Sequence, residues 1–387
     1  MYPSQFEIGS DSEELIKTHM DPIISSDKTK EIFTDFARKS ASKICIILGA
    51  GASRGYSRDP NYTYTPPIVS ELLDEKNYLV RETLKKSTHQ DIKGHRAQME
   101  RRIKGFGGDL EAYLSDLYEN DTADDRFPSM LRYLEDIFTL ASNNADLDDN
   151  YYKSLLSTVR DLRGSKRWSI LTFNYDTVLE RSLADLPIFT PRRSFNKDED
   201  YLNVNPRVLK MHGGVNFRYI TPLDPELSVA PSAHQTFTEM MVNNKSTESY
   251  LELKDIKSGI PDTIGHRTYP DVGGRTVTNF PLMMIPIHTS IKSTNSFFTR
   301  QIELAKEEVS QSGLVVAIGY QFGDDTFIES LKGLNLKEST LILVGSKNLL
   351  KDTVNSRAYQ EASKVWPKEN IKIFGEDGFG SFVDALY

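Results

Sequence analysis

A buried strand that runs directly into a glycine turn is the feature that most constrains the fold of this chain. Residues 43–48 read KICIIL, and residues 49–55 read GAGASRG. A short apolar run without polar alternation is typical of a central parallel strand that is covered on both faces. Glycines directly after such a strand let the backbone turn sharply and let its N–H groups approach a phosphate closely. Residues 43–55 therefore predict the first strand and ligand-binding turn of a parallel α/β sheet.

The turn departs from the fingerprint of the dinucleotide-binding dehydrogenases. That fingerprint is G-x-G-x-x-G/A, followed about 20 residues later by an acidic residue at the end of a second strand. Here Arg54 stands at the third small position, and Gly55 comes one residue late. Glu71 lies in the expected range but within a helix-like segment, IVSELLDE. A nicotinamide-dependent dehydrogenase is therefore disfavoured, and an ordinary structural turn stays an alternative for this segment taken alone.

The composition is that of a globular protein with a large α/β domain and an appended part. The chain has 387 residues, of which 38% are hydrophobic and 26% are charged, so one core does not account for its full length. Its 47 basic and 55 acidic residues give a net charge of −8. That balance disfavours a general nucleic-acid or anionic-membrane surface. With no apolar run of membrane-spanning length and a polar, acidic N-terminus, we expect a cytoplasmic protein.

The single cysteine, Cys45, lies in the middle of the first predicted strand. One cysteine excludes an internal disulfide and a zinc ribbon built from thiolates, and it suits a reducing compartment. Its position within an apolar run indicates a small core residue rather than a reactive thiol.

Three regions are predicted along the chain. Residues 1–40 form an N-terminal arm and a helix, which covers residues 28–39. Residues 79–164 read as a helical insert, because apolar residues recur at helical spacing there and no strand signal interrupts them. The remaining parts, residues 41–78 and 165–387, form the α/β domain. The predicted fold class is α/β, with a Rossmann-like doubly wound parallel sheet and a helical insert domain.

Some connecting segments carry weaker expectations. Residues 56–64 form a long loop beside the glycine turn, which suits either a lid or a passive surface loop. Thr65-Pro66-Pro67 reads as the start of a helix that ends at Leu73. Residues 218–279 are polar and contain several prolines, so we expect a long excursion there.

Each later strand also ends in polar residues or glycines. Residues 168–173 (WSILTF) precede Asn174-Tyr175-Asp176, and residues 208–211 precede His212-Gly213-Gly214. Residues 281–287 are a further strand, after which a helix is predicted at 297–310. Residues 314–318 (LVVAI) precede GYQFGDD, and residues 340–344 (TLILV) precede Gly345-Ser346. Open α/β sheets bind ligands at the carboxyl ends of their strands, so these residues are candidates for a site.

Five of these motifs, in this order, resemble those of the sirtuin-like family in its bacterial and phage-defence branch: GAGAS, TFNYD, KMHGG, AIGYQFGDD and LVGS. Sirtuins carry G-A-G-x-S, T-Q-N-x-D, H-G and a G-T-S or G-Y-S turn. The resemblance extends over the strand–turn units from residue 44 to residue 346, and it leaves out the helical insert and the 218–279 excursion.

The resemblance implies a role for each matching residue. Asn174 would hold the nicotinamide ribose and a water molecule, and His212 would be the general base. Asp176 would order the turn that carries Asn174. The pyrophosphate of NAD would lie on Ala50, Gly51, Ala52 and Ser53, and the adenosine half would be lined by Gly319, Tyr320, Gly345 and Ser346.

The departures from the family pattern indicate which activity to expect. A CxxC…CxxC zinc ribbon is missing, the family's G-I-P-D-F-R is replaced by the 56–64 loop, and Phe173 stands where deacylases have Gln. These differences point away from a peptide deacylase. They suit a relative that hydrolyses NAD to nicotinamide and ADP-ribose, without zinc, and so depletes NAD in anti-phage defence by abortive infection.

Other functions stay open from the sequence. A protein deacylase, a catalytically weak NAD or ADP-ribose sensor and a DNA-binding or nuclease subunit are the alternatives. The helical insert and N-terminal arm are candidate surfaces for homo-oligomer formation or for a partner, which by resemblance would be a HerA-type ring ATPase, a prokaryotic Argonaute or a phage component. The central expectation is that the Asn174 amide and the His212 imidazole face one cavity beside the first glycine turn.

Overall fold

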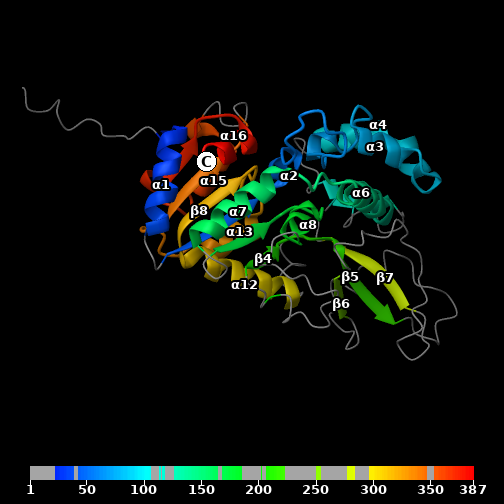
Figure 1. The fold of residues 1–387 in the computed structure, drawn as a ribbon. Coiled ribbons are helices and arrows are strands. Elements are labelled where there is room, and N and C mark those ends of the chain that lie inside the picture. Colours follow the sequence, from blue (N-terminus) through cyan, green and yellow to red (C-terminus); the bar gives the residue numbers. More distant parts are fainter. Residues whose placement is uncertain are drawn as a thin grey trace, which may run out of the picture.

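The computed structural model describes residues 22–38, 42–105, 113–114, 116–117, 126–163, 168–184, 202, 206–222, 250–253, 277–283, 296–346 and 353–387. Within these ranges the chain forms a seven-stranded sheet and a separate three-stranded sheet, with helices packed around them (Figure 1). None of the helices described there combines the length and the apolar character needed to cross a bilayer.

The large sheet is parallel and has the strand order β1-β10-β9-β8-β2-β3-β4. Its strands are β1 (Ile23–Ile24), β2 (Lys43–Leu48), β3 (Trp168–Thr172), β4 (Arg207–Lys210), β8 (Ser312–Ile318), β9 (Thr340–Val344) and β10 (Ile371–Phe374). Without the edge strand β1, this is the strand order of the doubly wound Rossmann fold. The order reverses between β2 and β8, and sheets of this kind hold their ligands at that switch point. The predicted Rossmann-like fold class is confirmed.

Helices cover both faces of this sheet. Alternate side chains of β2 point to opposite faces, and because those of residues 44–48 are all apolar, each face needs a covering layer. Ile44, Ile46 and Leu48 share one core with α1 (Ser26–Arg38), α7 (Tyr151–Arg163), α8 (Val178–Ala184) and α16 (Gly378–Asp384). Cys45 and Ile47 share the other core with α12 (Ser296–Ser310), α13 (Asp325–Leu331) and α15 (Arg357–Ala362). Helix α7 thus packs directly on the sheet, although the sequence places it within the helical insert.

The other helices of residues 79–164 whose bounds fall within the described residues lie together at one side of the sheet (Figure 1). They are α3 (Tyr78–Leu84), α4 (Gln90–Gly105) and α6 (Arg126–Asn143), with a 3₁₀ turn, η2 (Ser87–His89), between the first two. Tyr113, Leu114 and Leu117 are buried as their helical spacing predicts, and Leu110 lies outside the described residues. The boundaries predicted for the three regions stay a prediction, and the arm before residue 22 also lies outside the described part.

The small sheet is antiparallel and has the order β6-β5-β7, from β5 (Gly213–Pro222), β6 (Tyr250–Leu253) and β7 (Val277–Met283). The 218–279 segment is therefore not wholly an excursion, because part of it forms this sheet. Residues 215–219 read VNFRY, an alternating pattern suited to a strand with one buried face. The strand predicted at 281–287 begins earlier and includes residues 277–283, and its other predicted residues lie outside the described part.

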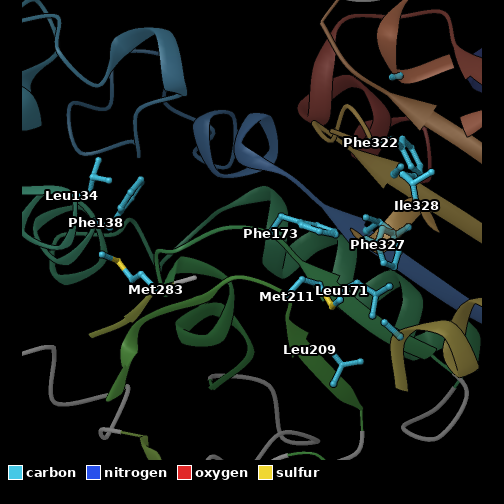
Figure 2. Close-up of a cluster of buried hydrophobic side chains, with 14 of the residues drawn as sticks. Leu134, Phe138, Leu171, Phe173, Leu209, Met211, Met283, Phe322, Phe327 and Ile328 are labelled. Carbon is cyan, nitrogen blue, oxygen red and sulfur yellow. The ribbon is translucent and has the colours of Figure 1, made fainter. Parts of the chain in front are cut away.

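The buried side chains connect the two sheets and the helices. Figure 2 shows Leu171 and Phe173 near the carboxyl end of β3, with Met211 and Phe327 beside them. It also shows Met283 of β7 beside Leu134 and Phe138 of α6, within the same buried cluster. One continuous core therefore joins the end of the parallel sheet to the helices at its side.

The predicted helix from Thr65 to Leu73 is wrong, since only one 3₁₀ turn forms there, η1 (Val69–Glu71). The Thr65 hydroxyl accepts a hydrogen bond from the Arg54 guanidinium, so it does not cap a helix. Leu72 and Leu73 enter the core directly after this turn.

The loop of residues 56–64 is held against the connection between α6 and α7. The Tyr56 hydroxyl accepts a hydrogen bond from the Asp146 backbone N–H at 2.8 Å, and the Tyr56 carbonyl accepts one from the Tyr151 N–H at 2.8 Å. Arg58 pairs with Asp149 at 2.9 Å. A lid movement of this loop would break these contacts.

Candidate functional site

The predicted site residues follow strand ends that lie at one level of the sheet. Leu48 pairs with both Thr172 and Ile318, Thr172 pairs with Lys210, and Ile318 pairs with Val344. Each predicted residue comes within a few positions after one of these: Ala50, Gly51, Ala52 and Ser53 after β2, Asn174 and Asp176 after β3, His212 after β4, Gly319 and Tyr320 after β8, and Gly345 and Ser346 after β9. The fold thus collects these residues at one edge of the sheet, around its switch point.

The two glycine turns at the switch point fit into each other. Gly319 has φ +60°, and a Cβ on it would lie closer than 3.0 Å to the Ala52 nitrogen. A Cβ on Gly49 would similarly approach the Gly319 carbonyl oxygen. The Gly49 N–H donates to the Ile318 carbonyl at 3.0 Å, and the Gly51 N–H donates to the Gly319 carbonyl at 3.2 Å.

This contact changes the role assigned to the glycines. The sequence predicts that they bring backbone N–H groups to a phosphate. Instead, the Gly49 N–H binds the last residue of β8 and the Gly51 N–H binds the turn after it, and the missing side chains allow two backbones to touch. Ala50 begins the short helix α2 (Ala50–Arg54) and is itself exposed at the surface.

Asn174 extends from the end of β3 into this edge of the sheet and is only 6% exposed. Its side-chain Nδ2 donates a hydrogen bond to the Ser53 hydroxyl at 2.9 Å. Its Oδ1 is buried and accepts no hydrogen bond from the described residues. A buried acceptor without a donor costs about 1–3 kcal/mol, which a ligand hydroxyl or water would recover. The Asn174 oxygen is therefore the atom of this side chain that suits a ligand.

Ser53 is the centre of a buried polar group that orients Asn174. Its Oγ lies 3.1 Å from the hydroxyl of Tyr152, a residue of α7. Burial raises the pKa of Tyr152 well above its ordinary value, so the phenol keeps its proton and is a donor. Burial likewise raises the pKa of Asp176, and Lys210 and the Ser53 hydroxyl oppose that rise. The Ser53 hydroxyl thus accepts a hydrogen bond from Asn174 and interacts with both the Tyr152 phenol and the Asp176 carboxyl.

A buried ion pair fixes the turn that carries Asn174. Lys210 is fully buried, its ammonium lies 2.7 Å from a Glu180 carboxylate oxygen, and it also donates to the Asp176 carbonyl. Burial raises the pKa of Glu180, and the charge of Lys210 opposes this effect. Gly214 is needed here because a Cβ on it would collide with the Lys210 side chain. The second glycine of the HGG motif thus makes room for a lysine.

His212 lies at the end of β4 and is 4% exposed. Its Nε2 is 2.7 Å from Oδ2 of Asp324, the residue that caps the N-terminus of α13. The Phe173 ring meets the imidazole edge-on with a centroid distance of 5.0 Å, and Tyr320 stacks on Phe173 at 4.1 Å. Phe173 therefore links the predicted base to Asn174, its neighbour in the chain, and to Tyr320.

The structure brings most of the predicted residues into one connected group. Asn174 and Asp176 meet Ser53, Gly319 meets Gly51 and Ala52, and Tyr320 and His212 meet Phe173. Gly345 and Ser346 follow the neighbouring strand β9, and the Gly345 carbonyl accepts a hydrogen bond from the Gly378 N–H at 3.1 Å. Asn174 and His212 are both buried, and a cavity shared by them stays a prediction.

The sequence reasoning missed four residues of this group: Tyr152, Glu180, Lys210 and Asp324. Asp324 carries a local signal, because an Asp before a helical segment is a common N-cap. No local sequence signal distinguishes Lys210, Glu180 and Tyr152 from surface residues. Within the described ranges, no three His, Cys, Asp or Glu side chains gather as metal ligands do, and the expectation that the chain binds no zinc stays a prediction.

Comparisons with known proteins give only distant matches. No protein-family model matches the chain, and no curated protein sequence matches it. A solved structure from work on the mechanism and regulation of Sir2 enzymes is 14% identical and has a TM-score of 0.40, covering 93% of this chain and 95% of that chain. Sir2Tm bound to a propionylated peptide is 12% identical, with a TM-score of 0.37 and coverages of 92% and 96%. A mutant of a Sir2 homologue in complex with ADP-ribose is 10% identical, with a TM-score of 0.39 and coverages of 91% and 94%. Alignments this remote assign no role to any residue of this chain.

Proposed function

We propose that this chain hydrolyses NAD at the bond between nicotinamide and ribose. The observation that carries the proposal is the buried Oδ1 of Asn174, which has no hydrogen-bond partner among the described residues and lies beside Ser53 at the switch point of the sheet. A histidine follows the neighbouring strand at the same level. Five strand-end motifs resemble those of the sirtuin-like family, and this resemblance supports NAD as the ligand.

In this reaction NAD is the substrate and water is the second reactant. The bond between C1′ of the ribose and the nicotinamide nitrogen breaks, nicotinamide leaves as a neutral molecule, and the ribose passes through an oxocarbenium-like state. Asn174 accepts a hydrogen bond from a ribose hydroxyl or from the attacking water. His212 takes the proton from that water as its oxygen bonds to C1′. The products are nicotinamide, ADP-ribose and one proton.

The pyrophosphate is assigned to the start of α2, at Ala50, Gly51, Ala52 and Ser53. The adenosine half is assigned to the ends of β8 and β9, at Gly319, Tyr320, Gly345 and Ser346. Gly49 and Gly51 contribute mainly by letting the two turns approach each other, as their bonds to the end of β8 and its turn indicate. The sequence has no CxxC…CxxC zinc ribbon to hold a peptide, which favours hydrolysis over protein deacylation.

The test is the release of free nicotinamide from NAD by the purified chain, alone and with candidate partners. Asn174→Ala and His212→Ala are each expected to lower turnover at least ~10²-fold while the protein stays folded. His89→Ala is a matched control. His89 lies in η2 and is also buried, and its Nε2 is 2.8 Å from a carboxylate oxygen of Asp136 in α6. Full turnover in either site variant would contradict the assignment.

The same assay separates the alternatives. Binding of NAD without release of nicotinamide, under every condition, would indicate a sensor. Release of acetyl groups from a peptide in the presence of NAD would indicate a deacylase.

The biological setting is a further part of this proposal. By the motif resemblance, NAD depletion would belong to anti-phage defence by abortive infection in the cytoplasm. We expect a homo-oligomer or a partner such as a HerA-type ATPase to control the activity, because unregulated hydrolysis of NAD would harm the cell. Light scattering with and without NAD tests self-assembly, and addition of the partner to the nicotinamide assay tests control.

A further inference from the structure

The carboxylate of Asp324 binds two groups at the same time. Its Oδ1 accepts a hydrogen bond from the Phe327 backbone N–H at 3.1 Å, and its Oδ2 lies 2.7 Å from Nε2 of His212. Asp324 is 7% exposed and His212 is 4% exposed, so water competes little for either contact. An ionised carboxylate only accepts hydrogen bonds, and a neutral imidazole has one donor and one acceptor nitrogen. This contact therefore favours the tautomer with the proton on Nε2.

The position of Asp324 is determined by the helix that it caps. Asp324 has the extended backbone of an N-cap, with φ −85° and ψ 99°, and α13 begins at the next residue. The helix is fixed in turn by Phe327, whose ring packs against Phe173 at 5.3 Å. A negative charge at this end of a helix is favoured by the helix dipole. The carboxylate is thus held in place before any substrate arrives.

Two aromatic rings, those of Phe173 and Tyr175, also pack against the imidazole of His212. The centroid of Phe173 lies 5.0 Å from that of His212, and the centroid of Tyr175 lies 5.9 Å from it. The nearest charge along the chain, on Lys210, is bound to Glu180. The rings limit how far the imidazole can rotate, and the carboxylate determines which nitrogen carries the proton.

We propose that Asp324 is a positioning residue that holds neutral His212 with its proton on Nε2, so that Nδ1 is the proton acceptor. This inference rests on the proposed NAD hydrolysis and deepens it. The proton of the attacking water passes to Nδ1 and the water oxygen bonds to C1′, while the bond from C1′ to the nicotinamide nitrogen breaks and nicotinamide leaves with that electron pair. The Nε2 proton stays hydrogen-bonded to Asp324. Asp324 itself touches no reacting atom.

Asp324→Asn separates this role from simple capping. The asparagine oxygen is still needed as the acceptor for the Phe327 N–H, so the cap is kept. Its NH₂ group then faces Nε2 of His212, and because that group is a donor, the imidazole must present a lone pair there. The ring proton moves to Nδ1, so Nδ1 can no longer accept a proton from the attacking water.

The tautomer can be read directly by nitrogen NMR of the full chain labelled with ¹⁵N-histidine, at an alkaline pH where the ring is neutral. His212→Gln identifies the signal of His212 among the seven histidines. We expect a protonated Nε2 in the natural protein and a protonated Nδ1 in Asp324→Asn. Asp325→Asn is the matched control, because it removes the same charge one residue later from an exposed side chain, and it should leave the tautomer unchanged.

NAD turnover is the second measurement. Asp324→Asn should lower kcat at least ~10²-fold with little change in KM, since an inverted tautomer removes the base without removing a binding contact. Asp325→Asn should retain the natural rate. A protonated Nδ1 in the natural protein, an unchanged tautomer in Asp324→Asn, or an undiminished turnover in that variant would overturn the inference. The expected tautomers in a chain that does not cleave NAD would instead contradict the proposed function and leave only the control of the His212 tautomer by Asp324 in place.

Discussion

The hydroxyl of Tyr152 lies 3.1 Å from that of Ser53, although the two residues come from a helix and a turn that are about a hundred positions apart in the chain. Ser53 in turn accepts a hydrogen bond from Asn174. The helix α7 thus supports the orientation of the side chain that we assign to the ribose or the water. A segment that lies outside all the strand-end motifs therefore takes part in the site.

Tyr152→Phe tests this support. Loss of the phenol donor is expected to destabilise the fold by about 1 kcal/mol and to lower kcat for NAD about 10-fold, because Ser53 can then rotate away from Asn174. Tyr133→Phe is the matched control: its hydroxyl is also fully buried and donates to the Leu72 carbonyl at 2.7 Å. It should show a similar loss of stability in urea denaturation and a normal turnover. Equal turnover losses in the two variants would mean that Tyr152 acts only on stability.

Gly319→Ala should be strongly destabilising. The residue has φ +60°, and a Cβ would collide with backbone atoms of the first glycine turn. Gly333→Ala provides the comparison, since Gly333 has φ +82° with open space around it. We expect a loss of about 1–2 kcal/mol at 333, from backbone strain alone, and of roughly 3 kcal/mol or more at 319. Similar denaturation midpoints for the two variants would show that the turns can separate without loss.

Glu180→Gln should leave the charge of Lys210 buried without its carboxylate partner. Breaking a buried ion pair from one side typically costs about 3–5 kcal/mol. The double variant Glu180→Gln with Lys210→Met removes both charges of this pair, so it should regain part of that loss, while the buried Asp176 loses the charge of Lys210 that favours its ionised form. Chemical denaturation of the single and double variants measures the difference. A double variant no more stable than Glu180→Gln would show that the lysine is needed for its bond to the Asp176 carbonyl instead.

Cys45 provides a probe of global unfolding. Burial raises the pKa of its thiol to about 12 from an ordinary value of 9.0, so the native protein should react with thiol reagents only when the central sheet opens. The sign of the pH effect follows: a raised folded pKa contributes stability that is present below 9.0 and is lost as the pH rises towards 12. Cys45→Ala should lack this part of the alkaline decline. Rapid labelling of the native protein near neutral pH would contradict the burial of this strand.

The sequence predicts the central strands well because they are buried on both faces. Continuous apolar runs indicate β2, β3, β8 and β9, and the structure confirms all four within two residues. The two strands β1 and β10, at one end of the sheet order, could not be found in this way: β1 has two residues, and β10 (IKIF) has a lysine in its middle. Strand β5 alternates as a half-buried strand does, but the prolines after it favour a polar excursion.

The candidate site can be predicted only to the extent that the strand ends can. A parallel sheet aligns the residues that follow its strands, so motifs at those ends are enough to indicate Asn174, His212 and the glycine turns. The groups that orient them come from elsewhere. The Asp324 carboxylate reaches His212 across 112 positions of the chain, and whether an N-cap has a second partner depends on how α13 packs. The purpose of Gly214 also appears only when the buried Lys210 is seen beside it.

The interlocking of the turns after β2 and β8 also has a consequence for synthesis of the protein. During translation the first turn leaves the ribosome long before its counterpart, and it has nothing to fit against until β8 has been made. A polypeptide that ends before β8 therefore lacks the second of the two turns that form the switch point. If the chain hydrolyses NAD as proposed, polypeptides that end before β8 are expected to be inactive.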